Sequence, residues 1–205
     1  RYVLVVLGMS VALVSCSSRA MVHQGELYIG GSKTDSGMAL LKLVQPTVEV
    51  VEHATLDHRS YHPSAEQHVW ITNIDGQPVS KFLEKDQDPR MIKKYHLLPG
   101  KHEIAVMFEG SGTSVRFIHM FEDSVKMNFE YHCITKEPVV FELDIPAEAR
   151  FTVRAHAAQN KCDFSVTHND RVVAENAGRL RYTYSNIWDP KNWYLNQENL
   201  HQASH

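Results

Sequence analysis

Histidine is the residue type in this chain whose number and spacing could support chemistry. The 205 residues include 13 histidines, and one short polar stretch holds His53, His58, His62 and His68. Neutral imidazole is a good ligand for zinc, copper and nickel. However, intervals of five, four and six residues match neither a helical metal pair nor a known zinc motif. We therefore expect a solvated loop over residues 53–67 with weak affinity for zinc or copper and no required cofactor, and we keep metal binding as the alternative.

The motifs of common enzyme classes are missing from the sequence. It contains no Gly-x-Ser-x-Gly, no His-Glu-x-x-His and no phosphate-binding glycine loop. The glycine-rich run at residues 109–114, Glu-Gly-Ser-Gly-Thr-Ser, lies between two alternating segments and predicts a hairpin turn. A formal net charge of -3 provides no basic field for nucleic acid. We expect a protein that is not an enzyme and has no nucleic-acid partner.

The N-terminal residues carry the strongest signal in the sequence. An apolar run follows Arg1 and Tyr2 and extends over residues 3–14. It is too short to cross a bilayer, which takes about 20 apolar residues, and its length is typical of the apolar region of an export signal. The run ends in the letters LVSC, with the cysteine at position 16. A buried strand or an ordinary secretory signal with a chance cysteine are the alternatives.

The LVSC ending resembles the lipobox of bacterial lipoproteins, in which the signal is cut before a cysteine that then becomes lipidated. The resemblance implies a signal peptide over residues 1–15, a lipidated Cys16 with an acyl chain such as palmitate, and a tether over residues 16–24. Ser17, where Asp is absent, resembles lipoproteins sorted to the outer membrane of Gram-negative bacteria. The expected location is therefore the bacterial cell envelope, on an outer membrane and facing the periplasm.

If Cys16 carries the lipid, Cys133 and Cys162 remain as a pair in an oxidising compartment, where a disulfide is expected. Both cysteines lie on the apolar face of an alternating segment, Cys133 with Phe129 and Cys162 with Phe164. Both sulfurs should therefore point into the core. Closing this loop would contribute roughly 3–4 kcal/mol to stability. The alternative is two reduced thiols that pack as small apolar groups.

Alternation of apolar and polar residues with a period of two dominates the rest of the chain and predicts an all-β protein. Hairpin signals at Asp75-Gly76 and Pro99-Gly100 support antiparallel pairing. We expect an antiparallel β-sandwich over residues 25–174, or two small β modules split near residue 112. A polar and aromatic tail follows over residues 175–205, irregular or with a short helix over 190–201. The expected core includes Trp70, Ile104, Val106, Phe108, Phe129, Phe141, Val153 and Phe164.

Two segments of this region also resemble a known module. Residues 74–76 read IDG, and residues 95–106 read YHLLPGKHEIAV. Together they resemble the pattern of PEGA-like β-sandwich modules, which have an Ig-like arrangement of strands and occur in bacterial envelope proteins. The Gly-x-x-Pro between the two motifs and the Gly-Tyr after them are absent here. The resemblance implies an adhesive or structural module rather than a specific reaction.

The expected function is therefore that of a membrane-anchored envelope lipoprotein with a non-catalytic interaction or structural β module. Its partners would be the membrane, through the lipid, and another envelope protein. The alternative is a periplasmic lipoprotein that binds a transition metal through the histidines between residues 53 and 68.

Overall fold

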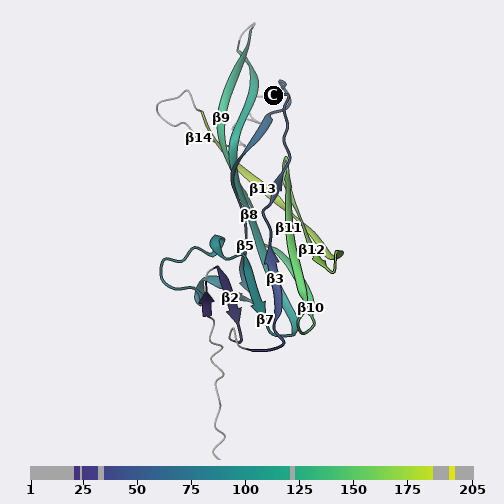
Figure 1. Cartoon of the computed structure of the whole chain (residues 1–205). Coiled ribbons are helices and arrows are strands. Elements are labelled where there is room, and N and C mark those ends of the chain that lie inside the picture. The colour runs from purple at the N-terminus through teal and green to yellow at the C-terminus, as the bar shows by residue number, and fades with distance from the viewer. Residues whose placement is uncertain (1–20, 24, 32–34, 121–122, 187–193, 197–205) are drawn as a thin grey trace, which may run out of the picture.

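The described part of the chain is built almost entirely of β-strands. The computed structural model describes residues 21–23, 25–31, 35–120, 123–186 and 194–196 (Figure 1). The all-β prediction is confirmed, with two short 3-10 turns, η1 (Val79–Phe82) and η2 (Pro89–Met91), added between strands. These described segments include no helix of the length and apolarity needed to cross a membrane. The strands are β1 (Met21–His23), β2 (Glu26–Ile29), β3 (Ala39–Leu43), β4 (Thr47–Val48), β5 (Ser60–Ile74), β6 (Gln77–Pro78), β7 (Lys94–Leu97), β8 (Gly100–Met120), β9 (Asp123–Thr135), β10 (Val139–Ile145), β11 (Arg150–Ala158), β12 (Lys161–His168), β13 (Arg171–Asn186) and β14 (Tyr194–Asn196).

The strands form one large sheet in the order β1-β2-β7-β3-β11-β12-β13-β9-β8-β5-β6, with β4, β10 and β14 paired off this path. The sheet is mixed rather than purely antiparallel, because β2 is parallel to β7 and both β3 and β4 are parallel to β11. Parallel neighbours need a long connection between them. Hairpin signals in the sequence cannot reveal such pairs, since they report only strands that follow each other directly.

The longest strand, β8, contains the glycine-rich run that predicted a turn. That prediction is wrong, because Gly110 and Gly112 lie inside β8 and pair with strands on both sides. A Cβ atom at Gly112 would meet the backbone oxygen of His62 and the ring of Tyr131. Glycine is needed here because neighbouring groups approach the backbone closely. As a result β8 runs through residue 112 without a break, and it rises with β9 above the other strands (Figure 1).

The C-terminal strand β13 joins the two halves of the sheet. Residues 171–179 pair with β12, and residues 180–186 pair with β9. The tail expected from residue 175 therefore begins later, because β13 continues to Asn186. Of the helix expected over 190–201, only residues 194–196 are described, and they form the strand β14.

Several predictions about the N-terminus lie outside the described residues. The signal peptide over 1–15 and Cys16 are among them. Of the tether over 16–24, the described residues form β1, which pairs with β2.

The core follows the alternation that the sequence shows. In β10, every second residue from Val139 to Ile145 is buried, and β11 and β12 alternate similarly. Fully burying one such side chain stabilises the fold by about 1.5–3 kcal/mol. All eight residues named from the sequence are buried: Trp70, Ile104, Val106, Phe108, Phe129, Phe141, Val153 and Phe164.

Cys133 and Cys162 are both buried, as expected from strand parity, but they are free thiols. The disulfide predicted between them is not formed. Cys133 pairs with Tyr182 of β13, whereas Cys162 pairs with Gly178 of the same strand.

Candidate functional site

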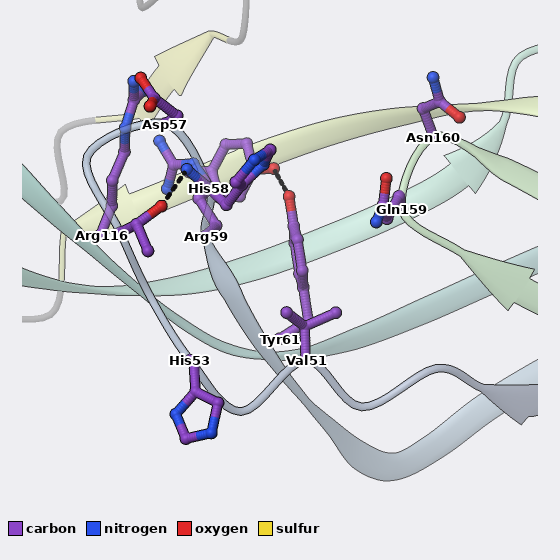
Figure 2. A pocket seen from close by; sticks show the side chains of 11 residues that line it. Val51, His53, Asp57, His58, Arg59, Tyr61, Arg116, Gln159 and Asn160 are labelled. Atoms are coloured by element: carbon purple, nitrogen blue, oxygen red, sulfur yellow. Dashed lines mark hydrogen bonds between the residues drawn. The ribbon is translucent and has the colours of Figure 1, made fainter.

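A cavity of about 460 Å³ lies where the upper parts of β5, β8 and β13 meet the turn between β11 and β12. Figure 2 shows Asp57, His58, Arg59 and Arg116 gathered at one end of this cavity, with Gln159 and Asn160 at the other. The lining residues are Val51, His53, Thr55, Asp57, His58, Arg59, Tyr61, Arg116, Gln159, Asn160 and Tyr184.

A loop before β5 positions the cationic end of the cavity. Val51 and Tyr61 close its base with two backbone hydrogen bonds of 2.8 and 3.1 Å. At its tip, the backbone N–H of Thr55 donates to the His58 carbonyl at 2.9 Å, and His58 N–H donates to Thr55 Oγ1 at 3.1 Å. Arg59 lies between this turn and the first residue of β5, so both ends of its segment are fixed.

The guanidinium of Arg59 rests on two aromatic rings. Its central carbon lies 4.0 Å from the ring centre of Tyr184 and 4.6 Å from that of Phe129. Cation–π attraction of this kind stabilises a desolvated guanidinium. Nevertheless, Nη1 and Nη2 of Arg59 are buried and have no hydrogen-bond partner among the described residues. Burial lowers the pKa of Arg59, but a guanidinium stays charged at neutral pH.

Arg116 of β8 brings a second guanidinium to the same end of the cavity. Ser60, the first residue of β5, pairs with Val115, and Arg59 and Arg116 are the residues next to this pair along the chain. Arg116 Nε donates to the backbone oxygen of Leu56 at 3.2 Å and so ties the loop to β8. Its positive charge also contributes to the lowered pKa of Arg59.

Tyrosines continue the face of the sheet that carries Arg59. The hydroxyls of Tyr61 and Tyr184 lie 3.1 Å apart and share a hydrogen bond. Burial raises the pKa of Tyr184, so it remains a neutral phenol and gives Arg59 no anionic partner. Tyr61 pairs with Ser114, and Gly112, two residues away, pairs with Tyr131. Alternation places these side chains on one face.

Two further polar atoms on this face are also unpaired. Within the described part of the chain, Ser114 Oγ and the Tyr131 hydroxyl are buried and have no hydrogen-bond partner. Burying a polar atom without a partner costs about 1–3 kcal/mol. Of the three residues with unpaired polar atoms, Arg59 lines the cavity, whereas Ser114 and Tyr131 lie outside its lining.

The structure separates the four histidines proposed as metal ligands. His53 and His58 are exposed in the loop and line the cavity, and Figure 2 shows His53 apart from the cationic end. His62 and His68 instead belong to β5, which begins at residue 60, so the loop predicted over 53–67 is shorter than expected. The described residues contain no group of three or more His, Cys, Asp or Glu side chains placed to hold a metal ion.

Other polar clusters join one element to another. His102 lies with Nδ1 2.8 Å from Asp75 and with Nε2 2.8 Å from the Leu98 carbonyl. Arg90 forms ion pairs with Asp88 and Glu109, at 2.7 and 2.8 Å. These contacts fasten the IDG turn and η2 to the body of the sheet. At the Arg59 cavity, in contrast, Nη1 and Nη2 of Arg59 have no hydrogen-bond partner in the described segments.

What the cavity can do chemically is bind negative charge. Its described lining includes two arginines and one carboxylate, Asp57. Arginine binds planar oxyanions through paired N–H groups. Comparison of the chain with protein-family models, curated proteins and solved structures found no match.

Proposed function

We propose that this protein is a lipoprotein of the bacterial cell envelope whose β-rich body acts as a non-catalytic interaction module, held at an outer membrane and facing the periplasm. The observation that carries the proposal is the LVSC sequence ending at Cys16, directly after an apolar run of export-signal length. The β-body that follows has a buried core of its own. Such a body can act at the membrane through a lipid anchor and can bind another envelope protein.

We further infer that the body is a β-sandwich related to PEGA-like modules. The apolar core draws on β8 and β10 as well as on β11 and β12, as two packed layers would require. Asp75 of the IDG turn also accepts a hydrogen bond from the Glu103 N–H at 2.9 Å, which links the two segments of the resemblance. NOEs between Phe141 of β10 and side chains of the β11–β12 hairpin are expected. A β-sandwich would be contradicted if Phe141 showed NOEs only to strands paired with β10 and none to the β11–β12 hairpin.

The anchor can be tested by changing the cysteine of the LVSC sequence. The full precursor would be expressed in a Gram-negative host with labelled palmitate, followed by separation of membrane and soluble fractions. We expect the wild type to incorporate label and to sediment with membranes. The C16S variant should lose the label, because a serine oxygen does not replace the thioether that carries the lipid.

A Ser18→Ala variant is the matched control, since it changes a neighbouring residue outside the LVSC sequence. It should behave like the wild type. Membrane association and labelling that persist unchanged in C16S would refute the lipoprotein proposal.

A further inference from the structure

We propose that the Arg59 cavity binds a small molecule through an oxyanion, a phosphate or a carboxylate, held between Arg59 and Arg116. The proposal concerns the β-body alone and does not depend on the lipid anchor. It assigns a ligand class to a site built from the loop before β5, the upper part of β8 and the rings of Phe129 and Tyr184.

The first argument is an unbalanced charge. The rings of Phe129 and Tyr184 support the Arg59 guanidinium from their faces, but they accept no conventional hydrogen bond. Nη1 and Nη2 carry four N–H groups, and none has a partner in the described segments. A buried charge is ordinarily paired and hydrogen-bonded. An oxyanion is the ligand that supplies both the charge and the acceptors.

The second argument is the position of Arg116. Arg116 lines the same cavity as Arg59, and its charge disfavours that of Arg59. Two like charges close together repel each other unless something between them is negative. Asp57 also lines the cavity, but within the described part of the chain it forms no ion pair with either arginine. A bound oxyanion would relieve the repulsion between the two guanidiniums.

The third argument is the size and polar lining of the cavity. Besides the two arginines, its lining includes the hydroxyl of Tyr61 and the side-chain amides of Gln159 and Asn160, which could bind hydroxyl or amide groups of a ligand beside its oxyanion. The cavity of about 460 Å³ is within the usual range for small-molecule sites.

The loop gives the site a cover. Because Arg59 Nη1 and Nη2 are buried, an entering anion would first meet Arg116, whose Nε holds the loop at Leu56. Residues 52–58 are largely exposed, and backbone hydrogen bonds between Val51 and Tyr61 fix the base of the loop. A shift of this segment would open Arg59 to the anion.

The test is titration calorimetry on the full chain purified in detergent, with three probes: inorganic phosphate, succinate and a short-chain anionic phospholipid below its micellar concentration. These arms separate a free phosphate, a carboxylate and a lipid headgroup as the source of the oxyanion. We expect at least one probe to bind with a Kd below about 1 mM. Arg59→Met, which keeps the apolar stem on the rings, and Arg116→Gln should each weaken binding about tenfold or more.

Arg171→Gln is the matched control, because Arg171 is an exposed arginine at the β12–β13 hairpin, away from the cavity. It should leave binding unchanged. If Arg59→Met does not fold by circular dichroism, the Arg116→Gln result decides. The proposal would be overturned if none of the three probes bound at a concentration ten times the expected Kd. It would also be overturned if Arg116→Gln and Arg171→Gln weakened probe binding equally.

Discussion

Charged residues in this protein differ in whether a neighbouring side chain forms an ion pair or a hydrogen bond with them. Glu26 of β2 lies 2.6 Å from Lys94 Nζ and accepts a hydrogen bond from the Tyr28 hydroxyl at 3.1 Å. Its parallel neighbour β7 also brings His96 to 3.2 Å. Arg59, in contrast, has aromatic rings but no acceptor among the described residues. Glu26 should therefore stabilise the folded state by its charge, whereas the charge of Arg59 is available to a ligand.

The first prediction concerns Glu26 and pH. Its hydrogen bond with Lys94 is the main reason that its pKa falls from 4.5 to about 2. A carboxylate with a lowered folded-state pKa contributes stability that is complete above about pH 4.5 and is lost as pH falls towards 2. Glu26→Gln should lower the free energy of unfolding by about 1 kcal/mol at pH 7. The value is small because the ion pair between Glu26 and Lys94 is partly exposed and solvent screens it. Urea unfolding at pH 7 and near pH 2.5 would measure the difference.

Glu137→Gln is the control for this prediction, because Glu137 is exposed in the turn before β10. It should change stability little at either pH. An equal loss for Glu26→Gln at both pH values would show that the charge of Glu26 is not what stabilises the fold.

The second prediction concerns the two buried cysteines. Burial raises the pKa of Cys133 to about 12 and raises that of Cys162 as well. Since the thiolate is the reactive form, neither should react with a thiol reagent at pH 8 in the folded protein. In a C16S background and without reductant, two thiols should react once urea unfolds the chain. A count of zero after unfolding would mean that the cysteines form a disulfide in the cell.

Among the elements, β8 depends most visibly on individual backbone positions. Gly112 pairs with Pro63 of β5 and with Tyr131 of β9, so both flanking strands lie at fixed distances. The His62 carbonyl and the Tyr131 ring occupy the space that a side chain at Gly112 would need. The carbonyl belongs to the backbone and cannot rotate away alone.

The third prediction follows from this crowding. Gly112→Ala should lower the free energy of unfolding by about 1–3 kcal/mol, because the added methyl group forces β5 and Tyr131 apart. Chemical denaturation followed by circular dichroism would measure it. Thr113→Ala, at the adjacent exposed position of β8, should stay within about 0.5 kcal/mol of the wild type. A Gly112→Ala protein as stable as the wild type would contradict the close approach described for β8.

Strands with regular alternation could be predicted from the sequence, and others could not. Val139, Phe141 and Leu143 are buried and alternate with exposed residues in β10, which is the period of two that predicts a strand. Gly110 and Gly112 broke the same pattern in β8, because glycine marks a turn and a crowded strand alike. Whether a glycine lies in a turn or in a crowded strand depends on residues that are distant in sequence and close in space, and the sequence does not show which residues these are.

The candidate site was missed for a related reason. The sequence predicted a polar loop over residues 53–67, whereas β5 begins at Ser60. Arg59 lies in the shorter loop, directly before the strand that contains Tyr61. Its stacking partners Phe129 and Tyr184 come from β9 and β13, far along the chain. The histidines of the sequence indicated a metal-binding site in this loop as the alternative prediction. In the structure, the buried polar atoms of this loop that lack a hydrogen-bond partner among the described residues are Nη1 and Nη2 of Arg59.

Considered as a whole, the molecule is held together by strands that reach from one end to the other. β5 and β8 pair over most of their length, and β13 pairs first with β12 and then with β9. One apolar cluster includes residues of β2, β8, β11 and β13. No pair of modules split near residue 112 could unfold separately without breaking β8 in its middle.

The fourth prediction is a single unfolding transition. Urea melts followed by far-ultraviolet circular dichroism, which reports strands, and by near-ultraviolet dichroism, which reports the packed tyrosines, should coincide. The Tyr131, Tyr182 and Tyr184 rings pack together and give the second signal a defined origin. Two separated transitions would favour two modules with independent stability.

The parallel pairing of β3 with β11 has a consequence for how the chain assembles over time. Leu40 and Arg150 are register partners although more than a hundred residues separate them. Contacts this distant in sequence slow folding, because a large loop must close before the pairing stabilises anything. During synthesis, β3 emerges early and can pair with β7 on one side, but its other edge stays unpaired until β11 has been synthesised. A nascent chain halted before residue 150 would carry β3 with an open edge, and such an edge recruits other unfolded chains.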